Sequence, residues 1–178
     1  MKLTKMFRAS ATALCCLLAL ISCRQGPDAA SGPLAPVDVK VVDHLVAVLG
    51  HESCVLELVD PASGEKVKSI RLAQPPNGMA VDGATAYVAE GGPRGAVEVV
   101  DLESGALKRS FPAGHTPMSP VVRGGKLYVA CRFDSRVLEM DAATGTVLDS
   151  WNVPREPVAL ASCVVGTWYR LNTCATAR

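Results

Sequence analysis

The sequence has few aromatic residues and no excess of charge of either sign. Aromatic residues make up 4% of the 178 residues, and 18 Lys and Arg residues balance 17 Asp and Glu residues, which leaves a net charge of +1. The absence of a dense Lys or Arg run argues against a nucleic-acid-binding protein held by phosphate contacts. Hydrophobic residues nevertheless reach 49%, which excludes disorder over most of the length and predicts a core of Val, Leu and Ala.

The sequence also lacks the short motifs that mark common enzyme classes. It contains no Gly-x-Ser-x-Gly nucleophile elbow, no P-loop and no dinucleotide-binding fingerprint. We therefore predict no catalytic residue, no cofactor and no enzymatic activity for this chain.

The first 22 residues have the organisation of an export signal. Lys2, Lys5 and Arg8 form a basic start, and residues 9–22 then run without a charge. This apolar segment is short for a permanent membrane span, so residues 1–22 are predicted to be a signal peptide.

The signal ends in Leu20-Ile21-Ser22-Cys23, which resembles the bacterial lipobox. The resemblance implies that the Cys23 thiol receives a diacylglyceryl group and that the chain is a lipoprotein, held on the membrane by several acyl chains. An ordinary secretory signal that happens to end near a cysteine is the alternative. Arg24 follows Cys23, so no inner-membrane retention signal is evident, and we expect the periplasmic face of the outer membrane or the cell surface. Residues 23–40, rich at first in Pro, Gly, Ala and Ser, are predicted to form a flexible tether.

Residues 41–161 repeat at intervals of about forty residues. The pattern Asp-x-x-[Ser/Thr]-Gly begins at Asp60, Asp101 and Asp141, 41 and 40 residues apart. Tyr87-Val-Ala and Tyr128-Val-Ala keep the same spacing, as do three prolines (Pro76, Pro117 and Pro157). Each Asp-x-x-[Ser/Thr]-Gly unit suits a hairpin turn, because its carboxylate accepts turn N–H bonds and its glycine adopts the positive φ that closes the turn.

About four strands per forty residues is typical of a β-propeller blade. No segment after residue 23 has a convincing helical period. The predicted fold class is therefore all-β, a partial β-propeller of about three four-stranded blades after the N-terminal signal segment. Glu57, Glu98 and Glu139 recur at equivalent strand positions, which predicts outward-facing side chains of alternating strands rather than a catalytic pair.

The repeat resembles the YVTN β-propeller family of bacterial surface and periplasmic proteins. Val137–Ser150, Pro117–Val122 and Gly124–Ala130 carry the resemblance, which covers roughly residues 41–161. The segments around His115 and Arg155 are closest to a subgroup whose members often carry, or sit beside, a c-type cytochrome module related to di-haem peroxidases. That module needs a Cys-x-x-Cys-His motif, which this sequence lacks, so the haem function does not carry over.

Residues 162–178 do not continue the repeat. The family pattern predicts an Asp-Gly turn and a Tyr-Val-Ala strand after Ala161, but neither follows. Three blades cannot close a ring when closed propellers have about four to eight, so two apolar flanks would stay open. We expect a truncated or frame-shifted reading frame, with a short protein that completes its ring with other chains as the alternative.

Two histidines are weak candidates for ligand contacts. His51 lies in Gly50-His-Glu-Ser-Cys54, where no second metal-binding pair accompanies it, and His115 precedes Thr116-Pro117 in a loop between strands. We predict no metal site. Once Cys23 is lipidated and the signal removed, Cys54, Cys131, Cys163 and Cys174 remain, either as two disulfides or as free thiols.

The sequence thus favours a lipid-anchored binding or interaction module at the bacterial envelope, a fragment of a larger propeller. Its expected partners are the membrane and either another protein or a second copy through the open flanks, and not nucleic acid. The alternative is a propeller domain associated with a c-type haem peroxidase or electron-transfer system, or a lactonase-like enzyme.

Overall fold

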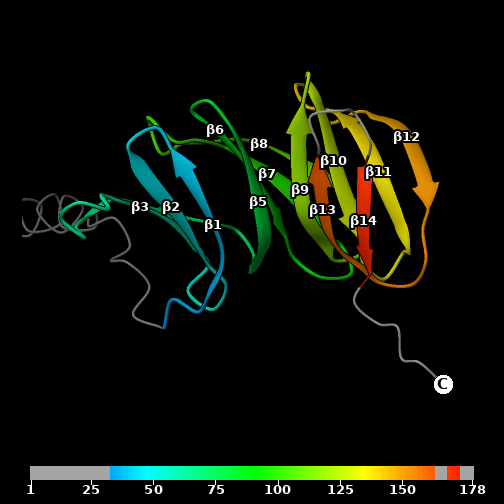
Figure 1. Ribbon diagram of the computed structural model, residues 1–178, viewed down its shortest axis with the longest axis horizontal. Coiled ribbons are helices and arrows are strands. Elements are labelled where there is room, and N and C mark those ends of the chain that lie inside the picture. Colours follow the sequence, from blue (N-terminus) through cyan, green and yellow to red (C-terminus); the bar gives the residue numbers. More distant parts are fainter. Residues whose placement is uncertain (1–32, 163–167, 173–178) are drawn as a thin grey trace, which may run out of the picture.

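The structure, a computed structural model, describes residues 33–162 and 168–172, and these form strands joined by turns and loops (Figure 1). Three antiparallel sheets of four strands each follow one another along the chain. Blade 1 contains β1 (Pro36–Val42), β2 (Leu45–Gly50), β3 (Val55–Val59) and β4 (Lys66–Arg71). Blade 2 contains β5 (Pro76–Asp82), β6 (Thr85–Glu90), β7 (Ala96–Asp101) and β8 (Leu107–Pro112). Blade 3 contains β9 (Pro117–Arg123), β10 (Lys126–Cys131), β11 (Arg136–Asp141) and β12 (Val147–Asn152).

A two-stranded sheet follows blade 3. It pairs β13 (Pro157–Ser162) with β14 (Trp168–Asn172) in antiparallel register, and we call this hairpin blade 4. The innermost strands stand in a row, because β1 packs on β5, β5 on β9 and β9 on β13. β1 and β13 lie at the two ends of this row (Figure 1). The prediction of an all-β fold with about three four-stranded propeller blades is confirmed.

Two segments differ from the sequence-based boundaries. Residues 36–40, assigned above to the tether, belong to β1, where Val39 pairs with Val48 and Lys40 with Ala47 of β2. Pro36, Asp38 and Lys40 gave this segment a linker-like composition, which concealed an edge strand that pairs on one side only. Residues 168–172, inside the tail for which no repeat was predicted, form β14.

The predicted hairpin turns are present. The carboxylate of Asp60 accepts a hydrogen bond from Ala62 N at 2.8 Å, and that of Asp101 accepts one from Ser104 N at 2.8 Å. The closing glycines Gly64, Gly105 and Gly145 have φ values of 75°, 76° and 74°. Each repeat therefore closes its outer hairpin with the same local chemistry.

The core consists of two layers, and each lies in a seam between neighbouring blades. One layer joins blade 1 to blade 2, with Leu49 and Leu56 packed against Met79 and Val88. The other joins blade 2 to blade 3, with Val97 and Phe111 in the same cluster as Leu127 and Met140. Blade 2, which contributes residues to both layers, thus buries both faces of its sheet, and its strands β6 and β7 read as nearly continuous apolar runs.

This packing corrects the expectation that Glu98 and Glu139 face outward. Glu57 differs, because it lies on end blade 1 and alternates along β3 with Leu56 and Leu58, which face blade 2. Glu98 is 6% exposed and Glu139 is 8% exposed, and the Glu57 side chain is 12% exposed. Alternation along a strand separates a core face from a solvent face in a single sheet, whereas here both faces of an inner blade are covered. Lys66 Nζ pairs with Glu57 and Lys126 Nζ with Glu139, each at 2.5 Å.

Cys54 and Cys131 are free thiols, and burial raises the pKa of the Cys131 thiol to about 11. Cys163 and Cys174 lie outside the described residues, as does Cys23. Among the described residues, no helix is long and apolar enough to cross a membrane.

Candidate functional site

The loops at one end of the blades bring the two candidate histidines to the same rim of the molecule. Each inner strand begins at this end, the bottom of Figure 1. We call it the lower rim; it comprises residues 51–54, 91–95 and 132–135 together with the blade connections 72–75, 113–116 and 153–156. Because strands in each blade are antiparallel, all of these segments return to one edge of the sheets.

His51 ties blade 1 to blade 2. Its Nδ1 lies 2.7 Å from the carbonyl oxygen of Pro76, the first residue of β5. His51 N also donates to Ala35 O at 3.0 Å, which holds the start of β1. The side chain is therefore already engaged in a contact between blades, which supports a structural role.

His115 belongs to an exposed cluster on blade 3. Its ring centroid lies 5.0 Å from that of Phe133, with the planes tilted by 50°. The guanidinium carbon of Arg132 lies over the same ring, 4.9 Å from the Phe133 ring centroid. Phe133 is 51% exposed, so the ring is held by a histidine and an arginine and still presents half of its surface to solvent.

Acidic side chains hold this cluster in place. Arg132 Nη2 donates to Glu156 Oε2 at 3.0 Å and Arg132 Nε donates to the same oxygen at 3.3 Å. His115 N donates to Asp134 Oδ2 at 2.9 Å. We call His115, Arg132, Phe133, Asp134 and Glu156 the rim cluster. Sequence reasoning selected only His115 from it, because the other four residues come from two other loops and no local motif links them.

Backbone strain at the rim follows the repeat. Ala35, Thr116 and Glu156 have φ values of 43°, 51° and 53°, and each directly precedes the proline that begins an inner strand. Positive φ in a non-glycine residue often marks a functional site. Here the positive φ recurs before the inner strands of three blades, which indicates a structural role: the residue turns the chain into the inner strand.

A second group of ionisable residues lies buried in the seam between blades 1 and 2. Glu90 is 1% exposed, its Oε2 accepts a hydrogen bond from Gln74 N at 3.3 Å, and its carboxyl interacts with that of Glu98. Burial first, and the neighbouring Glu98 carboxyl second, raise the pKa of Glu90 to about 7; burial also raises the pKa of Glu98. Glu98 Oε2 is buried and has no hydrogen-bond partner.

Within the described residues no three His, Cys, Asp or Glu side chains are grouped so as to hold a metal ion. The rim cluster is partly exposed, with Phe133 and Asp134 as its exposed members. A hollow of about 500 Å³ lies elsewhere, at the opposite end of the seam between blades 1 and 2, beside His44, Val67 and Leu102.

Solved structures similar to this chain are β-propellers. Hydrazine synthase from Kuenenia stuttgartiensis matches 80% of this chain and 43% of its own, at 18% identity and a TM-score of 0.70. The WD40 repeats of RRP9 match 73% of this chain and 42% of their own, at 16% identity and a TM-score of 0.64. BamB from Moraxella catarrhalis matches 70% of this chain and 37% of its own, at 16% identity and a TM-score of 0.57.

These likenesses show the fold alone. The chain spans less than half the length of each of these structural relatives. No protein-family model and no curated protein sequence matches it. The chain therefore has a β-propeller fold built from repeated blades, and its function must be argued from its own residues.

Proposed function

We propose that this protein is a lipid-anchored β-propeller module of the bacterial envelope that binds a protein partner through the rim cluster. The observation that carries the proposal is Phe133, which is half exposed and contacts both His115 and Arg132 at the lower rim. Propellers present loops on a rigid scaffold, and aromatic and arginine side chains are the residues most enriched at the energetic centres of protein interfaces.

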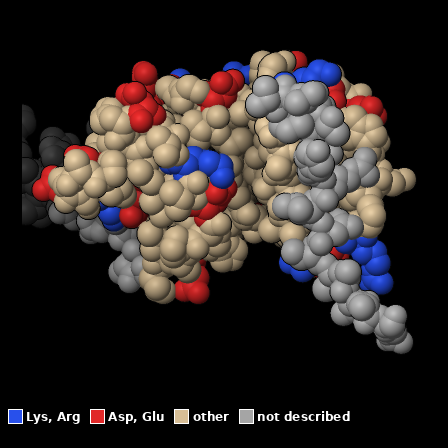
Figure 2. All heavy atoms as spheres, viewed as in Figure 1, with Lys and Arg blue, Asp and Glu red and all other residues tan. Residues whose placement is uncertain are grey.

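Charge at the same rim supports a protein partner. Arg71, Arg94 and Arg155 are exposed there, and Lys and Arg atoms gather at the lower end of blade 3 (Figure 2). Arginine is favoured at interfaces because its planar guanidinium forms several directed hydrogen bonds and stacks on aromatic rings. A partner segment with an aromatic or apolar residue and neighbouring carboxylates fits this surface.

The envelope location is proposed from the N-terminal sequence. The lipobox-like Leu20-Ile21-Ser22-Cys23 and the basic, apolar segment before it support acylation at Cys23. The YVTN-like repeat is in keeping with the same location. We propose a role without catalysis, because the sequence holds no enzyme motif and the rim cluster is a surface for contact.

Site-specific photo-crosslinking in living cells tests the proposal. The photoreactive amino acid p-benzoyl-phenylalanine replaces Phe133 in one variant and Leu148 in a control; both native side chains are 51% exposed, but Leu148 lies on the outer strand β12. The proposal predicts one discrete adduct at position 133, absent at position 148 and lost when Arg132→Ala is added. Equal labelling at both positions, or none at position 133, would contradict it.

A further inference from the structure

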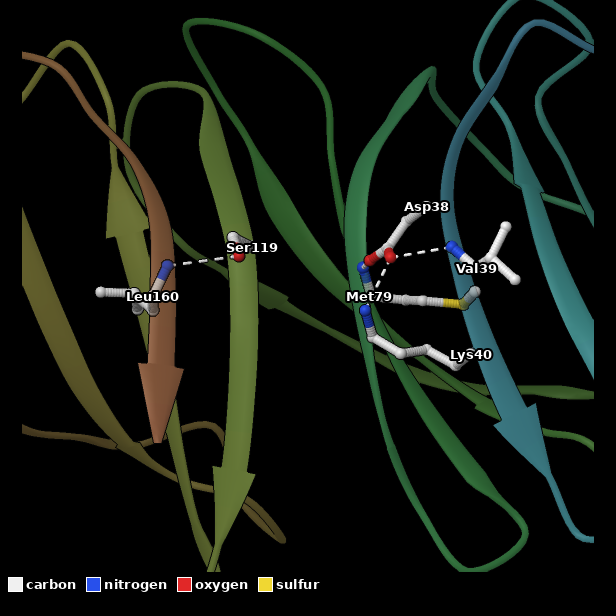
Figure 3. Close-up of polar contacts among 6 residues, drawn as sticks. All are labelled: Asp38, Val39, Lys40, Met79, Ser119 and Leu160. Atoms are coloured by element: carbon white, nitrogen blue, oxygen red, sulfur yellow. Dashed lines mark hydrogen bonds and ion pairs between the residues drawn. The ribbon is translucent and has the colours of Figure 1, made fainter. Parts of the chain in front are cut away.

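The inner strands of neighbouring blades are matched by a hydrogen bond at one fixed position. The third residue of an inner strand supplies an acceptor, and the fourth residue of the next inner strand supplies its backbone N–H. Asp38 Oδ2 accepts from Met79 N at 2.9 Å across the seam between blades 1 and 2. Ser119 Oγ accepts from Leu160 N at 3.3 Å across the seam between blades 3 and 4 (Figure 3).

The seam between blades 2 and 3 lacks both partners. Gly78 occupies the acceptor position and has no side chain, and Pro120 occupies the donor position and has no N–H. The backbones come close instead, because a Cβ added to Gly78 would lie 3.0 Å from Ser119 N. Each seam between described blades therefore has both partners of this bond or neither, so neither the acceptor nor the donor position holds one partner without the other.

The two open ends of the chain match each other by the same rule. At the end of blade 4 the acceptor position is Ala159, which offers no acceptor. At the start of blade 1 the donor position is Val39, whose N–H already donates to Asp38 Oδ1 of its own strand at 2.8 Å. Ala159 against Val39 would leave no polar group without a partner, just as Gly78 against Pro120 does not.

Side-chain size matches as well. In the seam between blades 2 and 3, small Gly78 and Ala80 face the larger Pro120 and Val122. The corresponding residues at the open ends are Ala159 and Ala161 on β13, and Val39 and Val41 on β1. Val39 is 53% exposed and Val41 is 76% exposed, so β1 presents an uncovered ridge of valines that faces away from blade 2.

We propose that a second copy of this chain covers β1 with its own β13, so that two copies join head to tail in a closed ring. The proposal goes beyond the function proposed above, because it names a second contact, which β1 and β13 make and the rim cluster does not. Two copies of three full blades and one hairpin blade provide eight blade positions, within the four to eight of closed propellers. The two faces are different surfaces of the chain, which makes the contact heterologous.

Cysteine crosslinking of the full chain tests the pairing. One tagged copy carries Val39→Cys and a second, differently tagged copy carries Ala159→Cys. Oxidation is expected to link the two copies, with no link when Val67→Cys, an equally exposed valine at 55% on the outer strand β4, replaces Val39→Cys. Linkage no greater than that of the Val67→Cys control, or Val39→Cys copies that link to each other, would overturn the proposal.

A single chain that carries both Val39→Cys and Ala159→Cys tests closure. A closed ring of two stops at the covalent dimer, whereas an open head-to-tail filament continues into trimers and larger species. A dimer without larger species is expected, and a ladder of larger species would overturn the two-copy ring. The photo-crosslinking experiment at Phe133 uses different variants from this cysteine experiment. Failure of the β1–β13 pairing can therefore be distinguished from failure of the rim cluster as a binding surface.

Discussion

Replacing Glu90 with Gln is expected to remove a pH dependence of stability that the wild-type chain shows. Burial and the Glu98 carboxyl raise the pKa of Glu90 from 4.5 to about 7. Between these pH values the folded chain binds more protons than the unfolded chain, so the free energy of unfolding falls as the pH rises. The stability due to the protonated carboxyl is complete below about pH 4.5 and is lost as the pH rises through about 7.

The size of this effect follows from the two pKa values. At about 1.4 kcal/mol for each pH unit between the two pKa values, the loss of stability reaches up to about 3.5 kcal/mol. That is a large part of the stability of a small domain. Glu90→Gln keeps a neutral group of similar shape in the seam, so the variant should lose this slope and be more stable than the wild type above about pH 7.

Urea unfolding at about pH 5, 6, 7 and 8 measures the slope directly. Glu139→Gln is the control, because Glu139 is also a buried glutamate, lies on β11 of blade 3 and pairs with Lys126. Its replacement leaves the Glu90–Glu98 pair intact. If Glu90→Gln retains the wild-type slope, or the wild type gains stability between pH 5 and 8, the reasoning about this buried pair is wrong. Glu98→Gln provides a second readout, with a reduced slope expected.

Two further predictions concern the lipid and the turns. Cys23→Ser is expected to abolish metabolic incorporation of an alkyne-labelled fatty acid while Cys54→Ser retains it; retained labelling in Cys23→Ser would contradict acylation there. Gly145→Ala should destabilise the chain more than Gly124→Ala in thermal unfolding. Both glycines have positive φ, which costs roughly 1 kcal/mol for alanine, but only at Gly145 would the new Cβ lie 2.2 Å from the Phe111 ring. Equal losses of stability in the two variants would contradict the prediction, because they would mean that the Phe111 ring can move away from the new Cβ without cost.

The sequence was sufficient to predict the blades, because the repeat carries its own structural signals. Turn carboxylates such as that of Asp101, and turn glycines such as Gly105, act within a few residues of the chain, so the local sequence is enough to predict the turn. The same reasoning failed for Glu98, because the exposure of a strand face depends on what packs on it, and that information lies about forty residues away in the neighbouring blade 1.

The rim cluster could be predicted only in part for a similar reason. His115, Phe133 and Glu156 come from three separate segments, and the propeller brings them to one rim without any shared motif. β1 was missed between Pro36 and Lys40 because an edge strand with one partner needs little apolar sequence. The hydrogen bonds between inner strands of neighbouring blades could not be predicted from local sequence either, since the Asp38 carboxylate accepts from a backbone N–H that lies 41 residues away.

The affinity of the crosslinked partner for the purified chain tests the central claim most directly. If the rim cluster is the binding surface, Phe133→Ala should weaken binding by at least about 10-fold, corresponding to a loss of about 1.4 kcal/mol or more. Leu148→Ala, which removes an equally exposed side chain from β12, should leave the affinity unchanged. Equal affinities for the wild type and Phe133→Ala would contradict the account.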